Sequence, residues 1–138
     1  MPFNRIYVNE QVDQRLRTLR ARTGLTPNLL CRLGFCLSLA ESGVPDPQLY
    51  STGQAREFNR YTLTGPWDTL FFALLRERLA ADELDPEKDL EVQFKAHLSR
   101  GVLLLYQRLR NLEDLAMLIE EAEKRAGPAD HRAGESNG

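Results

Sequence analysis

The sequence predicts a mainly α protein, a compact helical bundle of about five helices with a short N-terminal strand or extended arm. Apolar residues recur at helical spacing in several segments, and capping residues separate these segments. Hydrophobic residues make up 42% and charged residues 28% of the chain, as in ordinary folded domains. The 138 residues suit one folding unit, so we assign residues 1–126 to a single helical domain and residues 127–138 to a flexible polar tail.

Local signals place the first two helices. Residues 3–8 alternate weakly between apolar and polar and end at Asn9, a residue that favours helix N-termini, so a short strand or arm leads into a helix. Its predicted buried stripe is Val12, Leu16 and Leu19. Gly24 ends this helix, and Thr26-Pro27 begins the next one, which runs to about Glu41. This second helix is apolar on nearly every face, and we expect it to support self-association.

The remaining chain predicts further helices. Turn residues make 43–53 a loop, and strand-favouring residues make 57–63 extended. A helix begins near Pro66 and another at Asp85-Pro86. Their predicted inward residues are Trp67, Phe71, Leu74, Leu75 and Leu79, then Leu90, Phe94 and Leu98. Asn111, followed by two acidic residues, predicts that one helical piece ends before it and another begins after it.

The sequence offers little for catalysis or for metal binding. Of the two histidines, His131 falls in the expected tail, and we expect His97 to be a hydrogen-bonded structural residue. Cys31 and Cys36 match no common zinc or redox spacing, and we expect both to be small core residues. We therefore expect no enzyme activity, no cofactor and no metal. No apolar run is long enough for a membrane helix, and no secretion signal precedes the first helix, so we expect a cytoplasmic protein without membrane contact.

Positive charge is concentrated at the start of the chain. Residues 1–32 carry six arginines against two acidic residues, whereas residues 65–138 carry 10 basic and 15 acidic residues. On the first helix, Arg15 and Arg22 lie on one flank of the buried stripe, Arg20 lies on the other flank and Arg17 faces solvent. Such a set is either a solvated helix face or a phosphate-binding surface, and arginine binds phosphate in bidentate fashion.

Three segments resemble those of a known family. They are Thr-Gly-Leu-Thr-Pro-Asn at 23–28, Glu-Phe-Asn-Arg-Tyr-Thr-Leu-Thr-Gly at 57–65 and His-Leu-Ser-Arg-Gly-Val at 97–102. All three are similar to segments of the DndE family of DNA sulfur modification proteins. The resemblance implies a non-catalytic subunit that binds double-stranded or nicked DNA, forms tetramers, and works with other subunits that replace a phosphate oxygen by sulfur. The candidate DNA-binding residues are Arg5, Arg15, Arg17, Arg20, Arg22 and Arg60.

Two alternatives remain open from the sequence. A short strand, a basic helix and a Thr-Gly-Leu-Thr turn are also typical of ribbon-helix-helix repressors, which read bases with paired strands. The second alternative is a sulfur relay in which Cys31 or Cys36 carries a persulfide, which requires an exposed thiol of lowered pKa. Arg56, Lys95 and Arg100 are secondary candidates for a DNA surface.

Overall fold

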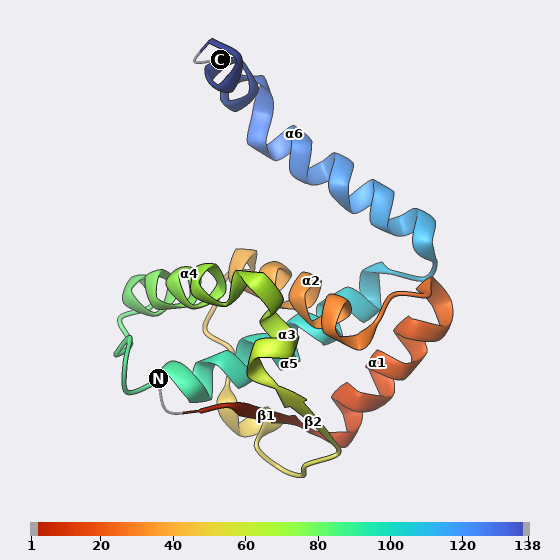
Figure 1. Cartoon of the computed structure of the whole chain (residues 1–138), viewed down its shortest axis with the longest axis vertical. Coiled ribbons are helices and arrows are strands. Elements are labelled where there is room, and N and C mark those ends of the chain that lie inside the picture. Colours follow the sequence, from red (N-terminus) through yellow and green to blue (C-terminus); the bar gives the residue numbers. More distant parts are fainter. Residues whose placement is uncertain (1–2, 137–138) are drawn as a thin grey trace.

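Helices make up most of the chain, which confirms the predicted mainly α fold class (Figure 1). The structure, a computed structural model, describes residues 3–136, and it describes side chains for residues 3–125. The elements are β1 (Arg5–Val8), α1 (Glu10–Thr23), α2 (Pro27–Ala40), a 3-10 turn (Pro47–Tyr50), β2 (Arg56–Asn59), α3 (Arg60–Thr64), a 3-10 turn (Gly65–Trp67), α4 (Asp68–Ala81), α5 (Leu90–Arg108) and α6 (Leu112–Ser136).

The first two helices begin and end where the sequence predicts. The Asn9 side chain accepts a hydrogen bond from the backbone N–H of Val12 at 2.9 Å and so caps α1. Gly24 adopts the left-handed conformation with φ 77° and donates its N–H to the carbonyl of Arg20. Thr26 then caps α2 through the N–H of Leu29. These local signals confirm the turn between α1 and α2.

Helices α2 and α5 form the centre of the molecule and cross in close contact. Gly34 of α2 faces Gly101 of α5, and a Cβ built on Gly101 would lie 1.9 Å from the carbonyl oxygen of Gly34. The two backbones therefore touch directly, and neither position has room for a larger residue. The α4 and α1 helices flank this pair (Figure 1).

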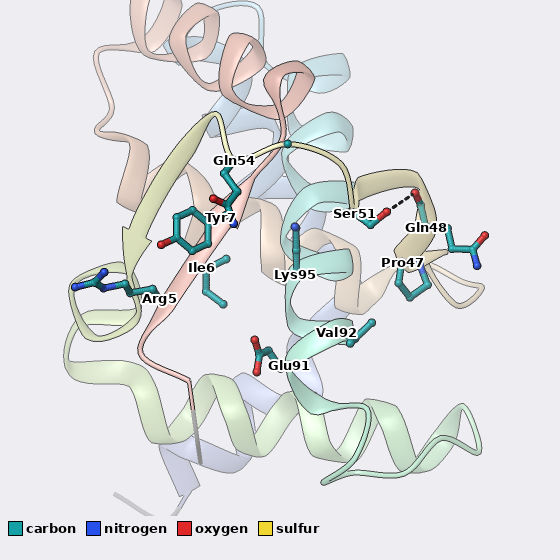
Figure 2. Close-up of a pocket in the computed structure, with 11 residues that line it drawn as sticks. Arg5, Ile6, Tyr7, Pro47, Gln48, Ser51, Gln54, Glu91, Val92 and Lys95 are labelled. Carbon is teal, nitrogen blue, oxygen red and sulfur yellow. Dashed lines mark hydrogen bonds between the residues drawn. The ribbon is translucent and has the colours of Figure 1, made fainter.

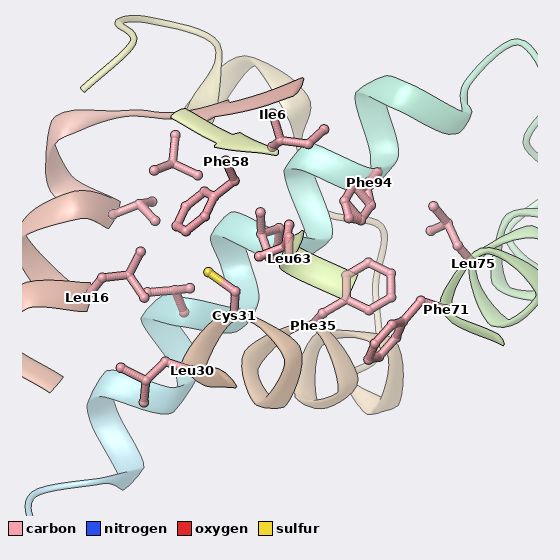
Figure 3. Packing of buried hydrophobic residues seen from close by; sticks show 14 of the residues in the cluster. Ile6, Leu16, Leu30, Cys31, Phe35, Phe58, Leu63, Phe71, Leu75 and Phe94 are labelled. Atoms are coloured by element: carbon pink, nitrogen blue, oxygen red, sulfur yellow. The ribbon is translucent and has the colours of Figure 1, made fainter. Parts of the chain in front are cut away.

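A cluster of aromatic rings fills the space around the central pair (Figure 3). Phe94 of α5 stacks on Phe72 of α4 with ring centroids 4.9 Å apart, and it lies 5.2 Å from the ring of Phe35 in α2. Phe3, just before β1, packs against the rings of Phe72 and Phe94. The start of the chain is thus fixed to the core by an aromatic anchor.

The strands form a two-stranded antiparallel ribbon in which Ile6 pairs with Phe58. The expected extended segment 57–63 is wrong in its second half, because the chain turns into α3 at Arg60. Asn59 causes this change, since its side-chain oxygen accepts hydrogen bonds from the N–H groups of Tyr61 and Thr62. A capping residue outweighs strand-favouring side chains here.

Three further expectations were wrong or shifted. Trp67 and Leu74 were expected inward but are 54% and 39% exposed, because α4 turns Phe71, Phe72, Leu75 and Leu79 toward the core instead. Cys36 was expected in the core but is exposed.

The break at Asn111 is confirmed between α5 and α6, but α6 continues to Ser136, past the point where we expected the tail to begin. The flexibility expected of residues 127–138 stays a prediction, since their side chains lie outside the described residues.

The α2–α5 crossing makes a direct prediction for stability. Changing Gly101 to alanine should lower the free energy of unfolding by more than the roughly 3 kcal/mol at the upper end of typical overpacking, because the new methyl group meets backbone that cannot rotate away. Gly53→Ala is the control, since Gly53 has open space around it and its φ of 83° costs only about 1–2 kcal/mol. Urea denaturation compares the two, and equal losses would contradict the proposed crossing.

Candidate nucleic-acid interface

Two of the candidate arginines share one aromatic ring. The guanidinium carbons of Arg15 and Arg22 lie 4.3 Å and 4.8 Å from the ring centroid of Tyr106. The two arginines are two helical turns apart on α1, and Tyr106 reaches them from α5. Stacking uses the face of a guanidinium and leaves its in-plane N–H groups free to donate to phosphate. Tyr106 thus restrains two candidate phosphate-binding arginines without neutralising them.

Arg20 lies on the other flank of α1, as expected, and is exposed. Within the part of the chain that the structure describes, it makes no ion pair or hydrogen bond through its side chain. With Arg22 it forms the basic last turn of α1. Arg15, Arg20 and Arg22 are therefore the candidates that have no carboxylate partner among the residues whose side chains are described, and together with Tyr106 they make up what we call the α1 basic face.

Two other candidates are exposed but paired with acidic residues. Arg17 lies 3.3 Å from Glu10 and 3.0 Å from the carboxylate of Asp13. Arg5 on β1 lies 3.1 Å from Glu57 on β2. To bind DNA, each of these arginines would have to exchange its carboxylate partner for a phosphate. At an exposed site such an exchange contributes little to the free energy of binding.

Arg60 does not lie on the surface. It is only 5% exposed, it forms a two-pronged ion pair with Asp68 at 2.8 Å and 3.0 Å, and it donates to the carbonyl of Phe3. Burial by itself raises the pKa of Asp68, but hydrogen bonds from Arg60 and Thr64 outweigh it and hold that pKa below its usual value. This geometry disfavours the predicted DNA contact of Arg60. It ties the start of α3 to α4 and to the N-terminal arm instead.

A groove of about 560 Å³ opens beside β1 (Figure 2). Arg5 and Tyr7 line one side, and Glu91 and Lys95 of α5 line the other. Lys95 is half-buried and has no ion-pair partner among the described residues, whereas Arg5 is held by Glu57. The groove thus offers one free cation close to the N-terminal arm, and Lys95 remains a secondary candidate.

The comparisons with known proteins identify the family. The family model described as DNA sulphur modification protein DndE matches residues 5–112. The chain belongs to the DndE family. This confirms the resemblance found in the sequence and places the protein in DNA sulfur modification. No curated protein matches the chain.

Two solved DndE structures are similar to this chain. A crystal structure of DndE from Escherichia coli B7A, involved in DNA phosphorothioation modification, has a TM-score of 0.62 and 25% identity, and the match covers 76% of this chain and 98% of that one. A glycine-to-lysine double mutant of DndE involved in DNA phosphorothioation has a TM-score of 0.59 and 23% identity, with 76% and 99% coverage. The helical core is therefore the DndE fold.

The family-like segments carry structural roles in this fold. In the segment 97–102, Arg100 donates to the Ser38 hydroxyl and to backbone carbonyls at the C-terminal end of α2, and Gly101 makes the close crossing. Arg78 of α4 donates to carbonyls at the same helix end. Two arginines thus satisfy orphan carbonyls of α2. Arg100 is engaged here, and Arg56 is paired with Asp13, so each of these two secondary candidates would have to give up existing contacts to bind DNA.

His97 is buried beside this arginine pair. The Ser38 hydroxyl, whose oxygen accepts a hydrogen bond from Arg100, lies 2.8 Å from His97 Nδ1 and is hydrogen-bonded to it. Burial, together with the charges of Arg100 and Arg78, lowers the pKa of His97 to about 4, against a smaller opposing effect of Asp82. His97 is therefore neutral near pH 7 and serves the α2–α5 contact.

The two thiols differ in position. Cys31 lies in the core, where burial raises the pKa of its thiol far above the ordinary value. Cys36 is exposed, but apolar neighbours on α2 and α6 still raise its pKa by desolvation. Neither shift favours the thiolate that a sulfur relay needs. No helix among the described residues combines the length and apolarity needed to cross a bilayer.

The buried histidine predicts a pH effect on stability. An unfolded chain protonates His97 near pH 6.5, whereas the folded chain does so only near pH 4. Between these values only the unfolded state gains the proton, so the free energy of unfolding should decrease as the pH falls from 6.5 to 4. In His97→Gln, which stays neutral, urea midpoints at pH 7 and pH 5 should differ less than in the parent. An equal difference in both chains would contradict a neutral His97.

Proposed function

We propose that this chain is a non-catalytic, DNA-binding accessory subunit of the DNA phosphorothioation machinery. The α1 basic face would contact the sugar-phosphate backbone of duplex or nicked DNA, while other subunits of the machinery carry out sulfur transfer. The observation that carries the proposal is the stacking of Arg15 and Arg22 on Tyr106 beside Arg20, which has no ion-pair partner in the described part of the chain. Such a surface fixes donors for phosphate but presents no set of side chains for reading bases.

The absence of catalysis is also part of the proposal. Of the groups that sequence analysis considered for chemistry, His97 is buried and neutral, and Cys31 and Cys36 have raised pKa values. A general base or nucleophile needs access to its substrate and a pKa near the working pH. These groups therefore support a binding role, and we propose that the chain needs no cofactor of its own.

Self-association by the family-like tetramer remains a proposal. Leu30 and Phe35 of α2 are buried inside the same chain, mainly by α5, which accounts for much of the apolar character of this helix. Leu29 is exposed, and Leu33 and Leu37 are half-buried. The apolar strip left on the surface of α2 is therefore narrower than the sequence suggested. The exposed Leu29 is what a family-type assembly through α2 would cover.

The ribbon-helix-helix alternative is not favoured. In that class, the strands of two chains pair and insert their side chains into the major groove. Here β1 pairs with β2 of the same chain, and Ile6 and Val8 are buried beneath it. The DndE family model also matches residues 5–112, well beyond the short strand and first two helices that resemble a ribbon-helix-helix protein.

The salt dependence of DNA binding tests the α1 basic face. The double variant Arg20→Ala with Arg22→Ala should bind unrelated duplexes more weakly and should flatten the logarithmic salt slope by up to about two units, since each phosphate contact contributes roughly 0.9. Fluorescence anisotropy with intact and nicked duplexes at several salt concentrations measures both effects.

The matched control is Arg76→Ala with Lys88→Ala, which removes the same charge from α4 and from the turn before α5. It should leave the slope nearly unchanged. If both double variants weaken binding equally, the effect is one of net charge, and the α1 basic face makes no specific contact. If neither does, Lys95 and its groove become the place to test.

A cysteine-free chain tests the relay. We expect Cys31→Ala with Cys36→Ala to support DNA sulfur modification in a host that carries the other subunits, because both thiols resist ionisation. The phosphorothioate content of host DNA is the measurement. Loss of modification by a folded and normally assembled double variant would establish a sulfur relay instead.

A further inference from the structure

Helix α6 lies outside the part of the chain that defines the family. The family match ends at Leu112, which is the first residue of α6, and 76% of this chain already covers 98% of the E. coli relative. Figure 1 shows α6 projecting away from the rest of the molecule. The helix is therefore an addition to the shared core.

An apolar groove of about 400 Å³ separates α6 from the core. Leu33, Cys36, Leu37 and Ala40 of α2 form one wall, and Leu115, Leu118, Ile119 and Ala122 of α6 form the other. Leu115 and Leu118 touch the core only in part, and Ile119 remains 51% exposed. Two apolar walls face each other across a space that the described residues leave open.

The start of α6 is held in its direction. Leu109 is fully buried, the N–H of Arg110 donates to the Asp114 carboxylate at 2.8 Å, and the N–H of Asp114 donates to the Asn111 side chain at 3.1 Å. These bonds fix the connection between α5 and α6 within three residues. The groove is thus not simply closed by rotating α6 onto α2.

We propose that the groove binds the α6 helix of a second copy of this chain. The helix and the groove are self-complementary, because the apolar face of α6 is both a wall of the groove and the surface that would fill it. A two-fold axis would place each α6 in the groove of the other copy, which gives two identical contacts and a closed dimer. Leucine and isoleucine side chains that are half-exposed in the single chain would then be buried.

Charge favours an antiparallel arrangement of the two α6 helices. The described part of α6, residues 112–125, carries five acidic residues and two basic residues. The acidic Glu113 and Asp114 lie in its first turn, whereas Lys124 and Arg125 lie near the other end of this stretch. Antiparallel pairing about Ile119 brings the acidic turn of one helix beside the basic residues of the other. The groove that receives this acidic helix is bordered by two basic residues, Arg108 and Arg125, and one acidic residue, Glu121.

Aspartate substitutions at two exposed residues of α6 distinguish a specific contact in the groove from a general effect of added charge on self-association. Ile119→Asp places a charge in the groove, whereas Met117→Asp places one at a residue that is 61% exposed and does not line the groove. Light scattering on the full chain should give half as many subunits for Ile119→Asp as for the parent and an unchanged number for Met117→Asp. Equal numbers for all three chains, or an equal loss in both variants, would overturn the proposal. Circular dichroism verifies that both variants remain folded.

Disulfide capture identifies the occupant. Ala122→Cys places a thiol across the groove from Cys36, and mild oxidation should yield a covalent dimer on a non-reducing gel, which Cys36→Ala in the same chain abolishes. A bond within one chain, seen as a monomer that migrates faster, would mean that α6 closes on its own α2 and would overturn the proposal. Absence of any Cys36-dependent bond would also overturn it. DNA binding is not needed for either experiment, so their outcome is independent of the proposed function.

Discussion

The contact between Gly34 and Gly101 sets the distance between α2 and α5, and most of the structure follows from that distance. Close approach of the two backbones brings the C-terminal end of α2 within reach of Arg100 and, from α4, Arg78. It also places His97 against Ser38 in a buried site where the ring stays neutral. Burying these polar groups is tolerated because the carbonyls at the end of α2 accept hydrogen bonds from charged arginine side chains.

The same residue type has two distinct uses in this chain. Arg32, Arg78 and Arg100 donate to backbone carbonyls, and Arg60 forms a buried ion pair. Such arginines hold helix ends and chain crossings in place, and their donors are occupied. The α1 arginines instead project from a surface helix, where an aromatic ring restrains two of them and leaves their N–H groups free. Which of these two roles an arginine has depends on the residues around its side chain in the fold and not on its neighbours in the sequence.

The sequence could predict what depends on neighbours in the chain. Caps at Asn9, Gly24 and Thr26 fixed α1 and α2, and the break at Asn111 was visible for the same reason. The burial of Arg60 could not be predicted, because Asp68 becomes its partner only after α3 and α4 fold against each other. Tyr106 was missed as part of the candidate site, since nothing in its own segment indicates that it meets a helix more than 80 residues earlier. Contacts between distant segments carry no local signal.

The two proposed surfaces use neighbouring sides of the end of α5. Tyr106 faces the arginines of α1, whereas Leu105 and Arg108 face the groove of α6. Pairing through α6 would therefore leave the α1 basic face open and would join two such faces in one assembly. If the α1 basic face binds DNA as proposed, its three arginines, which have no carboxylate partner among the described residues, would make few phosphate contacts and would bind modestly by themselves. Two linked faces gain affinity through effective concentration without any new contact, provided that both reach one duplex. The acidic α6 would repel DNA, which favours approach from the α1 side.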